Sequence, residues 1–302
     1  MEYLLMLVSI FFAVTNNCLL HLLPSSTFRT PGDIYFYNGC MNGGWVLLMA
    51  IFSLITGDFA ISWESVIFGV IYGVLLVAFL LSKSLAMVEG PVSLTTLIGC
   101  SCFVICTVFG AIYAKETIDF FQIIGMLLLL IGLILCVNPK KGDQPLTPRW
   151  FMYVALFFIT GGLVGILYKI FGQTDSGHMF NSMLLFAALT ASTLFLVLSF
   201  VINRKAKAPK PSIPPAARPS LLLCSFVSCV YIRMNLSLSN MIPSAIFFPV
   251  CNGGIILLAS LLGIVLFKER LQRIQMLGVA LGLLAIVLNG CSGLLMRLIL
   301  PQ

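Results

Sequence analysis

The sequence has few charged residues. Only 9% of its 302 residues are Asp, Glu, Lys or Arg, 60% are hydrophobic, and the mean hydropathy is +1.09. An average soluble domain has about 25% charged residues, so this chain could not cover the surface of a water-soluble globule. The composition therefore excludes a soluble enzyme, a nucleic-acid-binding domain and a disordered chain. It predicts a protein whose solvent is largely lipid.

The sequence also lacks the clusters of side chains that catalysis and metal binding require. None of the ten cysteines has the spacing of a metal site, and His21 and His178 stand alone near the ends of apolar stretches. Thiols within apolar segments usually pack as small hydrophobic side chains. We therefore expect no metal, no cofactor and no catalytic residue. A membrane-embedded enzyme is the less favoured alternative, because no nucleophile, base or metal site is grouped in the sequence.

Long apolar runs fill most of the chain. A helix needs about 20 apolar residues to cross the hydrocarbon layer of a membrane. Turn residues such as Pro24, Gly57 and Pro139 separate ten runs of about that length. The first run has no basic segment and no small-residue cleavage site, so we interpret it as a retained helix. The sequence predicts an all-α integral membrane protein with ten transmembrane helices, at residues 3–22, 34–55, 64–85, 91–113, 119–138, 149–170, 178–202, 219–239, 243–266 and 272–295.

Lysine and arginine are distributed unevenly between the predicted loops. Twelve of the 17 lie in one set of alternate loops, three lie in the other set, and two lie inside spans. Loops rich in Lys and Arg stay in the cytoplasm. The bias predicts that residues 203–219 are cytoplasmic and that both termini lie outside. The compact loops favour a bacterial plasma (inner) membrane.

The second half of the chain repeats features of the first. Gly110, Lys115-Glu116, Gln122 and Gly125 recur 153 residues later as Gly263, Lys268-Glu269, Gln275 and Gly278. We predict two repeats of five helices, residues 1–147 and 148–302. Because five is odd, the second repeat must be inverted relative to the first. Inverted repeats are typical of transporters, with the site near the membrane midplane at the repeat interface.

With these ten spans, the motifs at two junctions resemble the drug/metabolite transporter superfamily, EamA-like family. The motifs are Gly90-Pro91-Val92-Ser93-Leu94 and Gly110 with Lys115-Glu116, echoed by Pro243 to Pro249, Asn252-Gly253-Gly254 and Lys268-Glu269. The resemblance implies alternating access of a central cavity to a small organic metabolite. The expected partners are this substrate, membrane lipid, and a coupling proton or counter-substrate. Arg233, inside the eighth span, departs from the commoner apolar or amide pattern of the family.

Two basic residues lie inside predicted spans, where an ionisable group costs at least about 2.5–3.5 kcal/mol and is a functional candidate. Arg233 is the deeper one, and arginine cannot lose its proton. It is either a clamp for a carboxylate or phosphate, or a structural partner of Asn240 or of backbone carbonyls. For Lys83 we favour snorkelling, in which the ammonium reaches the membrane interface. A role in the site is the alternative, because the place of Lys83 in the first repeat nearly matches that of Arg233 in the second. We interpret Lys169, at the end of the sixth span, as an interfacial anchor.

Polar side chains on other spans complete the candidate site. Four residues of the second span are three or four apart and share one helical face. Such a stripe either lines a permeation path or forms hydrogen bonds between helices. Asn252 lies in the ninth span, Asn16 and Asn17 in the first, and Asn181 in the seventh. The predicted substrate-binding residues are Arg233, Lys83, Tyr35, Asn38, Asn42, Trp45, Asn252, Asn17 and Asn181.

No Asp or Glu lies in the middle of a predicted span. A cation exporter would use a buried carboxylate that alternates between proton and substrate. Its absence, with two intramembrane basic residues, favours an anionic or zwitterionic substrate. We interpret Glu89, at a helix junction, as an interfacial cap, with a proton site as the alternative. The predicted function is secondary transport of such a metabolite, and the alternative is a multidrug or amino-acid exporter of the same fold.

Overall fold

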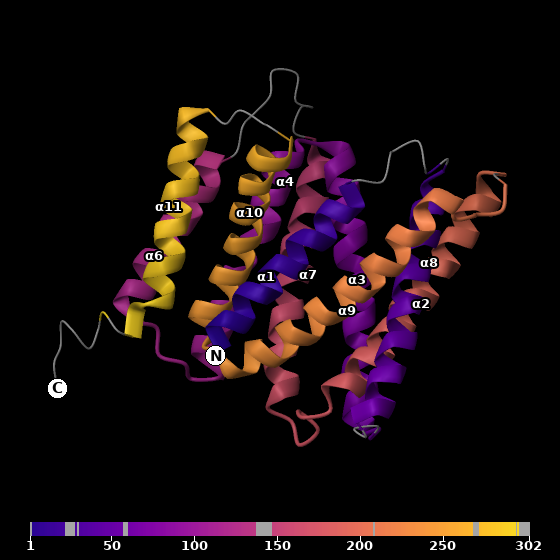
Figure 1. The fold of residues 1–302 in the computed structure, drawn as a ribbon, viewed down its shortest axis with the longest axis horizontal. Helices are drawn as coiled ribbons and strands as arrows, with labels where there is room; N and C mark the ends of the chain where they lie inside the picture. Colours follow the sequence, from indigo (N-terminus) through magenta and orange to yellow (C-terminus); the bar gives the residue numbers. More distant parts are fainter. Residues whose placement is uncertain are drawn as a thin grey trace. The chain divides into compact units, whose positions relative to one another are not determined.

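The protein is described by a computed structural model that covers residues 2–21, 28, 30–56, 60–136, 147–207, 209–267, 272–293 and 295. Over these residues the chain is helical and contains no β-strand (Figure 1). The second Lys-Glu turn, Lys268-Glu269, lies outside the described residues. The helices are α1 (Glu2–His21), α2 (Pro31–Thr56), α3 (Trp63–Glu89), α4 (Val92–Cys100), α5 (Phe103–Tyr113), α6 (Phe120–Cys136), α7 (Pro148–Gly172), α8 (Phe180–Lys205), η2 (Pro215–Ala217), α9 (Arg218–Met241), α10 (Ser244–Phe267) and α11 (Arg273–Gly290).

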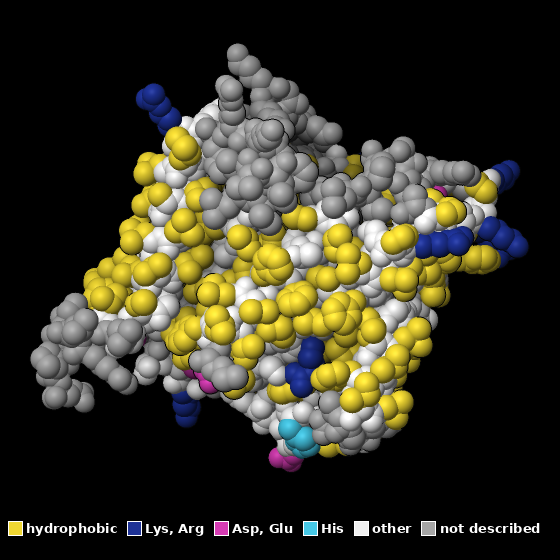
Figure 2. All heavy atoms as spheres, in the orientation of Figure 1, with side chains coloured by type: hydrophobic (Ala, Val, Ile, Leu, Met, Phe, Trp, Pro, Cys, Tyr) yellow, Lys and Arg dark blue, Asp and Glu magenta, His cyan; other side chains and the backbone are white. Residues whose placement is uncertain are grey.

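Eight segments of the described chain are long and apolar enough to cross a membrane. The chain is therefore an α-helical integral membrane protein. Two further apolar stretches are shorter, namely α6 and Ser244–Leu258 of α10. Hydrophobic side chains cover much of the face drawn in Figure 2, as contact with lipid requires. Each predicted span coincides with a helix, or with α4 and α5 together, but ten crossings and an inverted second half stay predictions.

Helix boundaries fall where the sequence offers capping groups or prolines. At the start of α2, the N–H of Thr30 donates to Asp33 Oδ2 at 3.0 Å, and the N–H of Asp33 donates to Thr30 Oγ1 at 3.3 Å. This reciprocal pair is a capping box. Pro91 separates α3 from α4 and Pro243 separates α9 from α10. The predicted boundaries at residues 85–91 and 239–243 are therefore confirmed.

The fourth predicted span differs from expectation, because Ser101 and Cys102 divide it into α4 and α5. The N–H of Cys102 bonds to the carbonyl of Gly99 at 3.3 Å, a three-residue step that tightens the backbone. A Cβ atom at Gly99 would overlap the ring of Phe157 on α7. The ring of Phe157, on α7, therefore packs directly on the backbone of α4 at Gly99, just before the break. The break therefore coincides with this tertiary contact and with the Gly99-Cys100-Ser101 sequence.

The chain divides into two compact units. The first unit comprises Met1–Ile10, Ala78–Lys169 and Leu238–Gln302. The second unit comprises Phe11–Val77 and Ile170–Ser237. The divisions fall inside α1, α3, α7 and α9, and each unit takes segments from both predicted repeats.

In the second unit, α2 and α8 lie side by side (Figure 1). Ser192 Oγ of α8 donates to the carbonyl of Gly39 at 2.8 Å, and Ser199 Oγ donates to the carbonyl of Gly32 at 2.6 Å. A Cβ atom at Gly39 would lie 2.8 Å from the side chain of Leu196. The glycines thus allow the close approach that small residues give membrane helices. This pair carries several of the polar groups described below.

In the first unit, α6 and α11 form a comparable pair. Gly132 of α6 faces Gly278 and Gly282 of α11, and a Cβ atom at Gly132 would lie 2.9 Å from the nitrogen of Gly282. Gln122 Nε2 also donates to Ser292 Oγ at 3.2 Å, just beyond the end of α11. Close backbone packing and a buried hydrogen bond therefore hold both helix pairs.

Candidate functional site

Arg233 is the centre of a polar cluster in the second unit. It lies in the second half of α9, a helix apolar enough to cross a membrane. Its Nε donates to Asn181 Oδ1 at 2.7 Å, and its Nη1 donates to Ser237 Oγ at 2.6 Å. Asn181 lies in the first turn of α8, and Ser237 lies one turn further along α9. An amide and a hydroxyl, both neutral, therefore fix the orientation of the guanidinium.

Phe180, the first residue of α8, packs against the same guanidinium. Arg233 Cζ lies 5.0 Å from the centroid of the Phe180 ring. This distance is within the cation–π range of about 6 Å. The ring of Phe180 is itself supported by Phe171 of α7, at a centroid distance of 6.1 Å. The cluster thus combines a fixed positive charge with an aromatic surface.

The cluster lies at the N-terminal end of α8. In the described structure, the N-cap residue Met179 makes no side-chain hydrogen bond to the first turn of the helix. The first N–H groups of any helix lack acceptors within it, and this end carries partial positive charge. Asn181 binds Arg233 from this first turn, so the guanidinium and the helix end add their potentials. Together they favour an anion, as other helix N-termini do.

Arg233 lies close to the start of α8. It is in the second half of α9, and its guanidinium bonds to Asn181 in the first turn of α8. The helix α9 runs obliquely to α8 (Figure 1). The charge therefore lies beside one end of α8 in this unit.

Trp45 of α2 contributes a buried donor near the same stretch of α9. Its side chain is 2% exposed, and its indole N–H has no hydrogen-bond partner of good geometry among the described residues. The indole lies against the thiol of Cys229, which is also close to Arg233 one turn further along. A buried donor without a partner costs stability. A buried donor of this kind needs an explanation, and hydrogen bonding to a ligand is one.

The remaining residues of the predicted stripe on α2 mostly serve their own helix. Asn38 Nδ2 donates to the carbonyl of Ile34 at 2.9 Å, and Asn42 Nδ2 donates to the carbonyl of Asn38 at 2.8 Å. The amide donors thus bond within α2 rather than between helices. The ring of Tyr35 stacks on Phe195 of α8 at a centroid distance of 6.5 Å. Tyr35 therefore has a packing role at the contact between α2 and α8.

The first helix places one of its two adjacent asparagines against α9. Asn16 Oδ1 accepts a hydrogen bond from Ser228 Oγ at 3.0 Å. Asn17, the member of this pair in the predicted set, is half-buried. The polar contact between α1 and α9 within this unit therefore belongs to Asn16.

Two predicted residues, Lys83 and Asn252, belong to the first unit and are described separately from the Arg233 cluster. Lys83 is half-buried on α3. Asn252 Nδ2 donates to the carbonyl of Phe248, one turn earlier in α10, at 3.0 Å. As in α2, the amide donor bonds to its own helix. The joint site of Lys83 and Arg233 stays a prediction.

Lys169, which we interpret from the sequence as an interfacial anchor, is buried in an ion pair at the end of α7. Its Nζ lies 2.8 Å from Glu116 Oε1 and donates to the carbonyl of Ile242 at 3.2 Å. The Lys169 side chain is only 6% exposed. Glu116 Oε2 accepts from the N–H of Ser244 at 2.7 Å, at the start of α10. The ion pair therefore joins the end of α7, the turn after α5 and the junction of α9 with α10.

The charge state of Glu116 follows from this geometry. Burial raises the pKa of the carboxyl, but the hydrogen bonds from Lys169 and Ser244 and the charge of Lys169 outweigh burial. The net pKa lies below the ordinary value of 4.5. Glu116 is thus ionised at neutral pH, and its negative charge is paired with the positive charge of Lys169.

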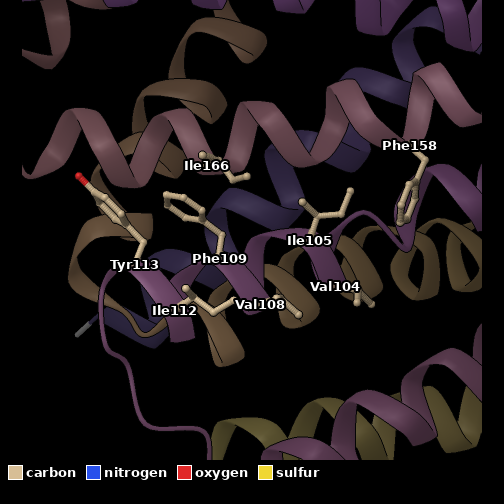
Figure 3. Close-up of a pocket in the computed structure, with 8 residues that line it drawn as sticks. All are labelled: Val104, Ile105, Val108, Phe109, Ile112, Tyr113, Phe158 and Ile166. Atoms are coloured by element: carbon tan, nitrogen blue, oxygen red, sulfur yellow. The ribbon is translucent and has the colours of Figure 1, made fainter.

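A groove of about 760 Å³ opens between α5 and α7 in the first unit (Figure 3). Its lining is apolar except for one tyrosine hydroxyl, and none of the predicted substrate-binding residues contributes to it. It therefore does not suit a small charged solute. The residues that define it include Val108, Phe109, Ile112 and Tyr113 of α5 and Phe158 and Ile166 of α7.

The described residues offer no evident metal centre. Within them, no three His, Cys, Asp or Glu side chains are placed so that they could hold a metal ion. The ten cysteines are all free thiols. The chemistry of the candidate site therefore consists of hydrogen bonding, charge and aromatic packing.

Three members of the Arg233 cluster were missed in the predicted set. Ser237 is four residues after Arg233, so helical periodicity could have placed it on the same face. Phe180 directly precedes Asn181, a predicted residue. Cys229 is four residues before Arg233, but only the contact with Trp45 distinguishes it from the other thiols.

Comparison with known proteins identifies the fold but no function. The sequence matches no known protein-family profile and no curated protein sequence. Among solved structures, 28 chains match it. One of them, described only as "Crystal structure of protein", is 14% identical, with a TM-score of 0.74 over 96% of this chain and 98% of that one. At this identity the likeness shows that the fold recurs among solved proteins, and nothing about activity.

Proposed function

We propose that the chain is a secondary transporter of the drug/metabolite transporter superfamily, EamA-like family. It moves a small organic anion or zwitterion across the membrane by alternating access. The observation that carries the proposal is the Arg233 guanidinium, which bonds to Asn181 and Ser237 at the N-terminal end of α8. A permanent positive charge in a membrane-spanning helix is expensive and is typically functional.

The cluster suits a carboxylate or phosphate. Arginine presents parallel N–H donors that match two oxygens of such a group, and these charge-assisted bonds are stronger than bonds to neutral acceptors. An anionic substrate oxygen therefore replaces Asn181 Oδ1 or Ser237 Oγ as the acceptor of a guanidinium N–H. The released amide or hydroxyl can then bond to the substrate. The indole N–H of Trp45 is a further donor for the same ligand.

The transport cycle follows from the proposed architecture. Two inverted five-helix repeats, residues 1–147 and 148–302, would exchange their conformations and expose the site alternately to each side. In the predicted orientation, with both termini outside a bacterial plasma membrane, the end of α8 that holds Arg233 faces outward. A coupling proton or a counter-substrate drives the cycle.

Uptake into proteoliposomes tests the proposal. The purified chain is reconstituted and supplied with radiolabelled carboxylates, phosphates and amino acids, and Arg233→Gln is compared with the wild type. Removing one partner of a hydrogen-bonded charge pair from a binding site costs about 2–5 kcal/mol, so uptake should fall at least about 30-fold. Arg218→Gln is the matched control, because Arg218 lies exposed at the first residue of the same helix.

Two results would contradict the proposal. Uptake at the wild-type rate in Arg233→Gln would exclude a role for the guanidinium in substrate binding. Equal losses of uptake in Arg233→Gln and Arg218→Gln would show that uptake depends on the total charge of α9 and not on the Arg233 cluster. Both variants are checked for folding by size-exclusion chromatography before reconstitution.

A further inference from the structure

The groove between α5 and α7 has the form of a ligand site. Its volume of about 760 Å³ is within the range of about 300–1,000 Å³ typical of small-molecule pockets. Ile112 is 75% exposed and Val108 is 49% exposed, so the groove is open to the surroundings of the protein. In Figure 3, Tyr113 lies at one end of the lining residues and Phe158 at the other.

The surroundings of this groove determine the class of its occupant. The stretch Leu94–Tyr113, which includes α5, and all of α7 are apolar enough to cross a membrane. An exposed apolar groove between such helices faces hydrocarbon, where a water-soluble ligand is excluded and an acyl chain is not. Nine helical steps separate Val104 from Tyr113, a rise of about 14 Å. The groove is therefore about as long as one leaflet of a hydrocarbon layer that is about 30 Å thick.

One end of the groove carries polar groups suited to a lipid headgroup. Tyr113, whose side chain lines the groove, is the last residue of α5, and Lys115 follows two residues later. Lys115 is exposed and has a left-handed backbone, with φ of 52°, so the chain reverses direction there. Both carboxylate oxygens of the neighbouring Glu116 are engaged, by Lys169 and by Ser244. Among the residues that the structure describes, the Lys115 ammonium has no ion pair, so it can bind an external anion.

We propose that this groove binds one anionic phospholipid. An acyl chain lies along Val108 and Ile112, and the phosphate lies at Tyr113 and Lys115. The site is independent of the proposed transport site, since it lies within the first unit and shares no residue with the Arg233 cluster.

Native mass spectrometry of the full chain tests the headgroup contact. The protein is released from detergent micelles after incubation with phosphatidylglycerol or with phosphatidylcholine, and bound lipid is counted by mass. The wild type should retain one phosphatidylglycerol molecule. Lys115→Asn, which tolerates the left-handed backbone, should bind this lipid about fivefold more weakly, the effect of one basic side chain near an anionic headgroup. Its binding of phosphatidylcholine should stay unchanged, and Lys210→Asn, an exposed lysine of the second unit, is the control.

A second variant tests the acyl chain. Val108→Trp fills the middle of the groove and should abolish retention of the phosphatidylglycerol molecule. Val70→Trp adds the same bulk at a similarly exposed position on α3 of the second unit and should leave retention unchanged. Equal retention in Val108→Trp and the wild type would overturn the proposal. Equal affinity of Lys115→Asn and the wild type for phosphatidylglycerol would also overturn it. So would a mass spectrum in which the wild type is a lipid-free dimer, because a second copy of the chain would then be the occupant of the groove.

Discussion

Lys169 in the first unit and Arg233 in the second are both basic residues within membrane-spanning helices, but their surroundings differ. Lys169 is 6% exposed on its side chain and pairs with the ionised carboxylate of Glu116. Arg233 is half-buried, and two of its N–H groups donate to the side chains of Asn181 and Ser237. The ammonium of Lys169 is thus bonded directly to a carboxylate. A guanidinium N–H bonded to a neutral acceptor gains when an anion replaces that acceptor.

The comparison separates a structural charge from a binding charge. Lys169 and Glu116 satisfy backbone groups on both sides of Pro243, the carbonyl of Ile242 and the N–H of Ser244. Their contacts hold a helix junction in one geometry. The Arg233 cluster instead combines a helix N-terminus, an aromatic ring and a nearby indole N–H. Substitutions in the first centre should therefore affect stability, and substitutions in the second should affect transport.

The largest expected effect is on stability, in Lys169→Met. Removing the ammonium leaves the Glu116 carboxylate buried without its counter-charge, which should lower the free energy of unfolding by about 3 kcal/mol. The measurement is SDS-induced unfolding of the purified chain in micelles. Lys169→Met combined with Glu116→Gln should recover part of the loss, because the uncompensated charge is gone. An unchanged free energy in the single variant would show that the pair is not structural.

Arg233→Lys should affect binding more than stability. Lysine keeps the positive charge but lacks the fork of donors that a carboxylate or phosphate matches. Substrate affinity should weaken about tenfold, equivalent to about 1.4 kcal/mol, with an unfolding free energy close to that of the wild type. The measurement is the concentration dependence of uptake into proteoliposomes. If Arg233→Lys lowered the free energy of unfolding as much as Lys169→Met does, Arg233 would be a structural charge like Lys169 and not a binding charge.

The stability supplied by Glu116 should depend on pH. Its pKa in the folded chain is below the ordinary value of 4.5, so the unfolded chain takes up the proton more readily. The contribution of the pair is complete above about pH 4.5 and is lost as the pH falls through the folded pKa. Thermal unfolding midpoints at stepwise lower pH should therefore fall more in the wild type than in Glu116→Gln. Parallel curves for the two proteins would contradict this assignment.

The smallest expected effect is in Asn38→Ala, a residue of the predicted stripe. Its amide donates to the carbonyl of Ile34 in the same helix, and that carbonyl keeps its helical bond after the substitution. Uptake should change less than about twofold, since no interhelical hydrogen bond is lost. Asn181→Ala, which frees Arg233 Nε, should reduce uptake by more than Asn38→Ala does. A larger loss of uptake in Asn38→Ala than in Asn181→Ala would show that the substrate binds at the stripe on α2 instead.

The helices themselves could be predicted from the sequence with good accuracy. Apolar runs of about 20 residues, with prolines at the junctions, determine where helices form in a membrane, and the structure keeps Pro91 and Pro243 as boundaries. The division of the fourth span is not among the sequence predictions, although Gly99 and Ser101, residue types that weaken a helix, lie at it. The ring of Phe157, 58 residues further along the sequence, packs on Gly99 at the same place, and this contact could not be predicted from the sequence.

The partners of charged residues could not be predicted from the sequence either. Glu116 lies 53 residues before Lys169, and Asn181 lies 52 residues before Arg233. Nothing local links the members of these pairs. The sequence does show which side chains are costly in a membrane, and therefore it indicated Arg233 and Asn181 individually. Only tertiary packing decides that Lys169 finds a carboxylate and that Arg233 binds an amide.

Thermal unfolding of the wild type, Arg233→Gln and Arg218→Gln against a panel of metabolites tests the central claim most directly. A ligand that binds only the folded chain stabilises it by about 2.7 kcal/mol at 100 times its Kd and raises the midpoint. We predict that compounds carrying a carboxylate or phosphate stabilise the wild type and Arg218→Gln, and leave Arg233→Gln unchanged. Stabilisation by cationic compounds alone, or by anions equally in Arg233→Gln, would contradict the assignment of Arg233 as the anion-binding residue.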